Sequence, residues 1–448
     1  MDEQKPQLKL NTRRTFLIGF AFFGILILWQ FYTHYVQLFL DELIPETQKN
    51  REVILGLIMA IDKILAVALI PLFGWMSDRT KTRIGRRMPY IIAGTAAAVL
   101  LFPLLAVMFI FNSLFGLIVI IILLSVAMHF YRSPAVALMP DVTPKPKRAA
   151  ANGIINFMGF IGVIIGSVIT MFFLVSKPDS AGMLPYITAS KNLIFIPFLF
   201  VSALMIVSLV LFVARFCEPK VVAEMKADME LGEKLSETLE PVKTEGKLGK
   251  QDRANFLILF GCITLWFFAF NAINSFSALY AKHILGTEQI GMAIAAMGIA
   301  GMITFLPAIK LSDKIGRKNS VLIGLVMMIV TLVLASFIRD MPLLVPLFAI
   351  AGSGWAIINL NSYPMLVEMS SAKNVGKITG YYYIAQQGSQ AITPIVAGFV
   401  FSSTSYAALF PYAATFMVLA FGLIFFFRTK STGKHPAETN ISEQHPQQ

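Results

Sequence analysis

Residues 74–90, GWMSDRTKTRIGRRMPY, connect two long apolar segments, and a shorter version of the pattern, LSDKIGRK, occupies residues 311–318. In each copy an Asp is followed by a Gly and then by consecutive basic residues. The two copies lie about half a chain apart, and each follows an apolar segment. A repeat at this spacing predicts two related halves with the same succession of elements.

The segments around these copies are strongly apolar. Of 448 residues, 56% are apolar and 14% are charged, which is more apolar side chain than a soluble core of this length can bury. Since a membrane-spanning helix needs about 20 apolar residues, we predict an all-α membrane protein with two pseudo-symmetric bundles of six transmembrane helices. The twelve predicted spans are 15–41, 52–77, 89–111, 113–139, 149–175, 192–214, 254–281, 287–310, 319–338, 341–368, 375–401 and 405–428.

Basic residues lie in every second gap between the spans, and the alternate gaps are acidic, mixed or uncharged. The positive-inside rule therefore predicts cytoplasmic termini and a multi-pass protein of the cell (inner) membrane. Arg13 and Arg14 precede an apolar run as in an export signal, but the run is too long and has no cleavage site. The net charge of +12 is thus explained by topology, and we expect no nucleic-acid partner.

A polar segment rich in Glu and Lys divides the chain. We predict a first bundle at 1–214, a cytoplasmic linker at 215–253, a second bundle at 254–430 and a disordered cytoplasmic tail at 431–448. The two cysteines, Cys217 and Cys262, are too few for a disulfide framework or a thiolate metal site. We expect no cofactor, no bound metal and a monomer in the lipid bilayer.

The duplicated motif resembles the signature that follows the second helix of each half in the major facilitator superfamily. Its longer first copy is similar to that of the glycoside–pentoside–hexuronide:cation symporters, and YRSPAVALMPD at 131–141 resembles their sucrose-transporter-like branch. The resemblance implies a major facilitator fold and a carrier that couples a sugar to a cation by alternating access. Ser125 and Val136 stand where plant sucrose carriers of this kind have Asp and Arg, so we do not transfer their proton site or sugar contacts.

The motif loops predict a gate at the cytoplasmic side. Asp side chains at helix ends can accept hydrogen bonds from cationic groups or helix N-termini, and the basic run also suits acidic lipid headgroups. The predicted gating residues are Gly74, Asp78, Arg79, Gly85, Arg86, Arg87, Asp141, Arg148, Asp313, Gly316 and Arg317.

One acidic residue lies deep inside a predicted span. A charge at the bilayer centre costs about 3 kcal/mol or more, which makes such a residue a candidate for function. Asp62 lies near the middle of 52–77, with Lys63 beside it. Loss of hydration favours a protonated acid, whereas an ionised carboxylate can coordinate sodium. We therefore predict that Asp62 couples transport to a proton or to sodium; the structural alternative is a static pair with Lys63.

Polar residues inside other spans predict a substrate cavity. Gln30, His34, Gln37 and Asp41 share one helical face, and amides on later spans offer donors and acceptors to sugar hydroxyls. His34 is a candidate for both ion coupling and sugar binding, or it only hydrogen-bonds another helix. A Trp ring can stack on a pyranose. The predicted substrate-binding residues are Gln30, His34, Gln37, Arg132, Asn271, Asn274, Trp355, Asn361, Gln386 and Gln387.

Together these features predict import of a glucoside-type di- or oligosaccharide with a proton. Sodium coupling is the first alternative. Efflux of an amphipathic molecule would favour an aromatic, apolar cavity over amide-rich helices, and a nutrient sensor would need an output domain. The spans carry no nucleophile motif, metal cluster or dinucleotide loop, so we do not expect an enzyme.

Overall fold

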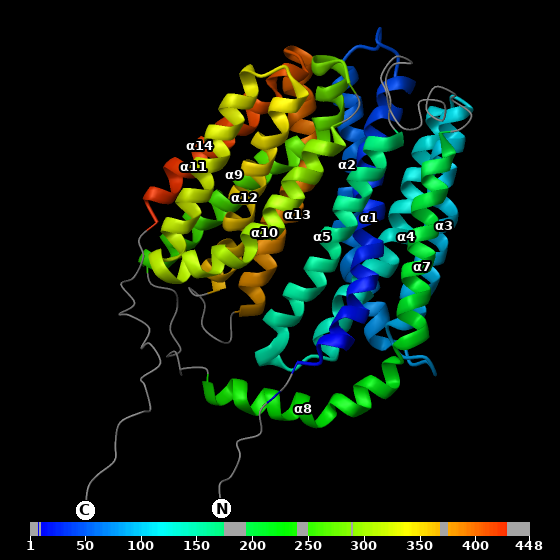
Figure 1. Ribbon diagram of the computed structural model, residues 1–448, viewed down its shortest axis with the longest axis vertical. Coiled ribbons are helices and arrows are strands. Elements are labelled where there is room, and N and C mark those ends of the chain that lie inside the picture. Colours follow the sequence, from blue (N-terminus) through cyan, green and yellow to red (C-terminus); the bar gives the residue numbers. More distant parts are fainter. Residues whose placement is uncertain are drawn as a thin grey trace, which may run out of the picture.

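The computed structural model describes residues 8, 10–173, 194–239, 250–287, 290–367 and 375–427 (Figure 1), and all regular structure in these residues is helical. The predicted tail at 431–448 lies outside them. The first half contains α1 (Thr12–Leu43), α2 (Arg51–Arg79), α3 (Met88–Ile110), α4 (Leu114–Asp141), the short η1 (Lys145–Lys147), α5 (Arg148–Phe173) and α7 (Phe195–Arg215).

A polar helix, α8 (Glu218–Leu239), follows the first half. The second half contains α9 (Lys250–Tyr280), its π-helical extension η3 (Ala281–Leu285), α10 (Gly291–Ile315), α11 (Arg317–Phe337), α12 (Met341–Val367), α13 (Val375–Ser403), the short η5 (Tyr406–Ala408) and α14 (Leu409–Phe425).

Eleven helices of the described chain are long and apolar enough to cross a membrane. The helix α13 is equally long, but its glutamines Gln386, Gln387 and Gln390 lower its mean hydropathy. It packs against α2 of the first half and α9 of the second, among the other long helices (Figure 1). It corresponds to the predicted span 375–401. The prediction of an all-α membrane protein is confirmed, whereas the orientation of the termini stays a prediction.

The two halves meet along three pairs of helices: α1 with α9, α2 with α13, and α5 with α10. Exchanging equivalent helices of the two halves converts the α2–α13 contact into the α10–α5 contact. This is the relation expected of two duplicated bundles packed about a pseudo-two-fold axis. The interior between the halves is therefore lined by matching helices from each.

The helix α8 lies across one end of the bundle, beside the start of α1 (Figure 1). We call this end the linker end and the opposite one the far end. Lys145 of η1 pairs with Glu233 of α8 at 3.3 Å, and Val221 and Met225 on α8 are buried. The sequence predicted a solvated, partly helical linker here without bounds for a helix. The polar face and few buried residues of α8 explain why the apolar pattern did not give those bounds.

Near the far end, α2 and α13 approach each other through two glycines. A Cβ atom on Gly56 would overlap the carbonyl of Pro394, and one on Gly398 would lie 2.6 Å from the carbonyl oxygen of Glu52. No residue larger than Gly fits at either position without moving the helices apart. The two halves are consequently in backbone contact at the far end.

We expect the substitution Gly56→Val to prevent this contact. Overpacking costs about 1–3 kcal/mol, so the ratio of closed to open far ends should fall by a factor of about 5 to 150. Transport in proteoliposomes should slow accordingly. The control is Gly422→Val on α14, where the added Cβ would meet no atom within 4 Å. Equal rates for both variants would contradict the prediction.

Candidate functional site

A charged cluster surrounds Asp62 in the interior of the first half. Asp62 lies about 17 Å along α2 from its first residue, at 1.5 Å per residue, and is 2% exposed. Its Oδ2 is 2.6 Å from Lys63 Nζ, and its Oδ1 accepts a hydrogen bond from Ser125 Oγ at 3.4 Å. His129 Nε2 lies 3.6 Å from the same Oδ1. The carboxyl group predicted for ion coupling is thus enclosed by polar groups from α2 and α4.

Two cationic side chains lie over the ring of Trp29 on α1. Lys63 Nζ lies 4.1 Å from the ring centre and the Arg132 guanidinium carbon lies 4.9 Å from it. The ring is also 5.6 Å from that of His129. Cation–π attraction of this kind is worth up to about 2 kcal/mol when desolvated. Sequence reasoning missed Trp29, although it directly precedes the predicted Gln30.

Positive charge exceeds negative charge in this cluster. Lys63 and Arg132 are cations, and Asp62 is the one carboxylate that pairs with either of them. Among the residues that the structure describes, no carboxylate lies within 4 Å of the Arg132 guanidinium. An intramembrane cation without a carboxylate partner favours the approach of an electron-rich or anionic group.

Buried polar atoms without protein partners lie between the halves. Gln37 Nε2 donates to the Asn274 carbonyl oxygen at 3.0 Å, but Gln37 Oε1 has no hydrogen-bond partner in the protein. The Nδ2 atom of Asn271, one turn from Asn274, also lacks one. Since buried polar groups are nearly always satisfied, these atoms suit water or ligand hydroxyls. Gln30 lies against Gly166 of α5 and His34 is 2% exposed.

The predicted substrate-binding residues of the second half differ from one another in their surroundings. Trp355 stacks on Phe270 with ring centres 3.9 Å apart, so one of its two faces is covered. Asn361 Nδ2 donates to the Ile357 carbonyl of its own helix at 2.8 Å. Gln386 and Gln387 are half-buried on α13. The structure brings the first-half candidates together more clearly than those of the second half.

A second buried carboxylate joins the two halves at the far end. Asp41 of α1 pairs with Arg51 Nη2 at 2.8 Å, Lys282 Nζ at 2.8 Å and His283 Nε2 at 2.9 Å. The π-helical turn of η3 allows the consecutive Lys282 and His283 to reach the same carboxylate. We call these four residues the far-end latch. Sequence reasoning placed Asp41 on a polar face but missed its three partners.

The first motif loop forms a network at the linker end. Arg87 pairs with Asp78 and, at 2.9 Å, with Asp141, which also pairs with Arg86 at 2.8 Å. Burial disfavours the charge of Arg87, but hydrogen bonds and charge from Asp141 and Asp78 outweigh it and raise its pKa above the ordinary value. The motif glycine Gly85 adopts φ +115°, which other residues rarely adopt.

Sequence reasoning missed Glu218, which completes this network. Its carboxylate accepts hydrogen bonds from the backbone N–H groups of Arg86, Arg87 and Met88 at 2.9–3.0 Å. These groups form the N-terminus of α3, where a negative charge is favourable. Glu218 begins α8, so the linker is tied to the motif loop. The acidic residue directly after the last span of the first half was the available signal.

The other gating candidates make local contacts. Arg148 donates to the carbonyls of Pro140 and Thr143 at 3.0 and 3.1 Å. The Arg79 guanidinium lies over the Trp75 ring, and the Gly74 carbonyl accepts from Ser77 Oγ at 2.8 Å. In the second copy Gly316 has φ +84°, Arg317 begins α11 and Asp313 is exposed. The two copies therefore share a glycine with positive φ at the same place of the motif.

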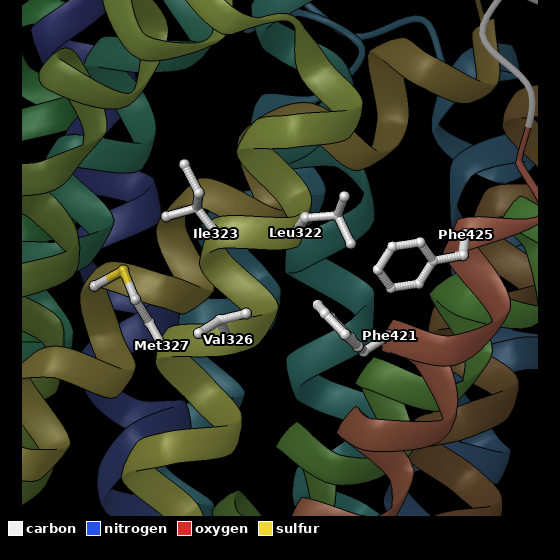
Figure 2. A pocket seen from close by; sticks show the side chains of 6 residues that line it. All are labelled: Leu322, Ile323, Val326, Met327, Phe421 and Phe425. Atoms are coloured by element: carbon white, nitrogen blue, oxygen red, sulfur yellow. The ribbon is translucent and has the colours of Figure 1, made fainter.

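Two further features bear on what the protein can bind. A recess of about 290 Å³ lies between α11 and α14. Figure 2 shows the apolar side chains that line it, such as Met327 and Phe421. This lining suits acyl chains and not a sugar. In the described part of the chain, no group of three His, Cys, Asp or Glu side chains converges as metal ligands.

Comparisons with known proteins agree with this architecture. Residues 17–427 match the family model described as MFS/sugar transport protein. The chain is 23% identical over 300 residues to the multi-drug resistance efflux pump PmrA homolog of Lactococcus lactis subsp. lactis (strain IL1403), an alignment that spans 64% of this chain and 66% of the pump.

Solved structures share the fold. The nucleoside transporter NupG superposes with a TM-score of 0.65 at 14% identity, covering 93% of this chain and 100% of that one. The POT family transporter PepTSo superposes with a TM-score of 0.65 at 13% identity, covering 94% and 98%. At these identities the likeness extends to the fold alone.

Proposed function

Because the chain belongs to the MFS/sugar transport protein family, we propose that it couples the uptake of a sugar to a cation, with the proton as first candidate. It is a multi-pass membrane transporter and not an enzyme. The observation that supports coupling is the buried Asp62 cluster, an ionisable group at membrane depth with polar partners from two helices. Inner-membrane location and the monomeric state belong to the same proposal.

Alternating access follows from the arrangement of the halves if the linker end is cytoplasmic. The latch and the Gly56–Pro394 contact then lie at the outer side and hold it closed in this conformation. The bundles 1–214 and 254–430 rock about the interior site, while the 215–253 linker stays with the first bundle through Glu218. The network of Asp78, Arg87 and Asp141 holds the motif loop during the cycle.

Protonation of Asp62 is the step that links ion and sugar. An ionised Asp62 holds Lys63 in an ion pair, with His129 Nε2 beside its other oxygen; once protonated, it releases Lys63 to other partners. Lys63 and Arg132 then hold excess positive charge beside Trp29, ready for a sugar oxygen. Release of the sugar returns Lys63 to Asp62, and the proton leaves to the cytoplasm. Sodium bound between the same oxygens is the alternative ion.

Two substrate classes have support. The unpartnered amide atoms of Gln37 and Asn271 suit the hydroxyls of a neutral glucoside. The surplus cation at Arg132 favours a sugar that carries an acidic group, such as a hexuronide. Efflux of an amphipathic molecule is the third possibility, because one relative is an efflux pump. The buried charge around Asp62 and the amides argue against that possibility, since an apolar drug would not satisfy them.

The test is substrate-induced alkalinisation outside proteoliposomes that hold the purified protein. We expect one sugar from a panel of neutral glucosides, hexuronides and monosaccharides to draw protons inward without sodium. A response to sodium alone would reassign the ion. If no sugar of the panel moves with either cation, the sugar proposal fails, and uptake of amphipathic dyes into inverted vesicles becomes the next measurement.

A further inference from the structure

A charged pocket lies at the linker end, away from the interior between the halves. It has a volume of about 620 Å³ and is formed by the first turns of α1, the last turn of α7 and the first turns of α8. Transport as proposed above uses none of its residues. Because spans α1 and α7 begin or end here, the pocket lies where the apolar core of a bilayer gives way to headgroups.

The pocket is basic. Its lining carries Arg13, Arg14, Arg215 and Lys220 against one acid, Glu224, so four positive charges face one negative charge and the balance is +3. Arg14 Nη2 pairs with Glu224 at 2.6 Å, whereas Arg13, Arg215 and Lys220 are exposed. Surplus cations from three helices around one pocket favour an anion with several oxygens, because arginines bind phosphate through two parallel hydrogen bonds.

One wall of the same pocket is apolar. Leu17 and Val213 line it together with the buried Phe216, and Val213 is 38% exposed. Leu17 and Val213 lie inside the spans α1 and α7, one helical turn or less from the basic residues. A ligand that fits this pocket therefore combines a negative headgroup with a hydrocarbon chain directed into the bilayer.

We propose that this pocket binds an anionic phospholipid, with the phosphate between Arg13, Arg215 and Lys220 and an acyl chain along Leu17 and Val213. The lipid joins α1, α7 and α8, and so fixes the start of the linker against the first half. A free phosphate ion would satisfy the basic residues but would leave the apolar wall uncovered, which is why the lipid is the better match.

Cys217 provides a direct readout, because it lines the pocket and is exposed, whereas Cys262 is 0% exposed. The full-length protein in detergent is titrated with phosphatidylglycerol, phosphatidylcholine or inorganic phosphate, and the rate of maleimide labelling is measured. Phosphatidylglycerol at four times its dissociation constant should slow labelling about fivefold and raise the melting temperature. Phosphatidylcholine should change neither.

The test variant replaces Arg13, Arg215 and Lys220 with Gln and should lose the protection by phosphatidylglycerol. The control replaces three exposed basic residues of the second half near this end, Arg253, Lys310 and Lys314, and should keep it. Equal protection by phosphatidylcholine, or retained protection in the test variant, would overturn the proposal. Protection by inorganic phosphate alone would assign the site to the free ion instead of a lipid.

Discussion

Replacing Asp62 with Asn is expected to abolish sugar accumulation driven by a cation gradient while sugar exchange continues. The amide cannot take up and release a proton, and it does not carry the charge that attracts Lys63 and His129. Sugar contacts elsewhere in the interior, such as Gln37 and Asn271, are unchanged. The variant should therefore move sugar down its own gradient without moving the ion.

The size of this effect follows from the driving force. One pH unit corresponds to 1.36 kcal/mol, so a symporter moving one proton per sugar accumulates sugar about tenfold for each unit of gradient. The Asp62→Asn protein should reach a ratio near one. Accumulation of radiolabelled sugar in proteoliposomes measures the ratio, and counterflow measures exchange. The control is Asp340→Asn, which removes an exposed carboxylate between α11 and α12.

A variant that loses exchange as well needs a further comparison. Breaking a buried ion pair by removing one partner costs about 3–5 kcal/mol, so Lys63 without Asp62 would destabilise the protein. The double substitution Asp62→Asn with Lys63→Gln removes both charges and should recover the melting temperature, but not coupling. Accumulation by the stable double variant would show that the ion binds elsewhere.

The sequence was sufficient for the fold because the decisive signals are local. Each span is long and apolar, and the repeated loop marks the same point of both halves. Its glycines, Gly85 and Gly316, both occupy positive φ, so their place in the pattern reflects backbone geometry. The linker was predicted to be solvated and partly helical, but the bounds and packing of α8 were not, since this helix is polar along most of its length and buries only a few residues against the first half.

The interior site was only partly predictable. Asp62 is conspicuous as an acid inside an apolar span, and its neighbour Lys63 is its partner. Trp29 is one aromatic residue among many, and its role depends on the rotation of α1 against α2 and α4, which hydrophobic periodicity does not specify closely enough. Trp355, in contrast, was predicted to bind sugar, but one face of its ring stacks on Phe270. That pairing depends on side-chain packing, which residue spacing cannot reveal.

The far-end latch was beyond prediction for a different reason. Asp41 and Lys282 are separated by more than half of the chain, and their contact depends on how the two bundles dock. The π-helical turn that presents His283 beside Lys282 has no apolar signature. Contacts between the halves also belong to one conformation of the transport cycle, whereas the sequence encodes every conformation of that cycle.

We expect Asp41→Asn to open the far end. The substitution leaves the cations Arg51 and Lys282, with the His283 ring, around an uncharged amide, and the loss of a buried partner costs about 3–5 kcal/mol. Since each 1.4 kcal/mol is a factor of ten, the ratio of open to closed far ends should rise at least about a hundredfold. Transport should slow, because the conformation closed at this end becomes rare.

The measurement is the distance between spin labels at Phe111→Cys and Phe337→Cys, in a Cys217→Ser background. Both positions lie at far-end termini, in different halves, and are 72% and 80% exposed. The distance distribution should shift to longer values in Asp41→Asn. The control is Glu42→Gln, whose exposed pair with Lys282 at 3.2 Å should contribute no more than about 1 kcal/mol.

A destabilised Asp41→Asn protein would leave the latch to be tested from the other half. The substitutions Lys282→Gln and His283→Gln remove both η3 partners of Asp41 but keep its pair with Arg51 at 2.8 Å. This variant retains a partnered buried carboxylate and should fold, yet its far end should also open. An unchanged label distance in it would mean that backbone contacts such as Gly56 against Pro394 hold the far end closed without the latch.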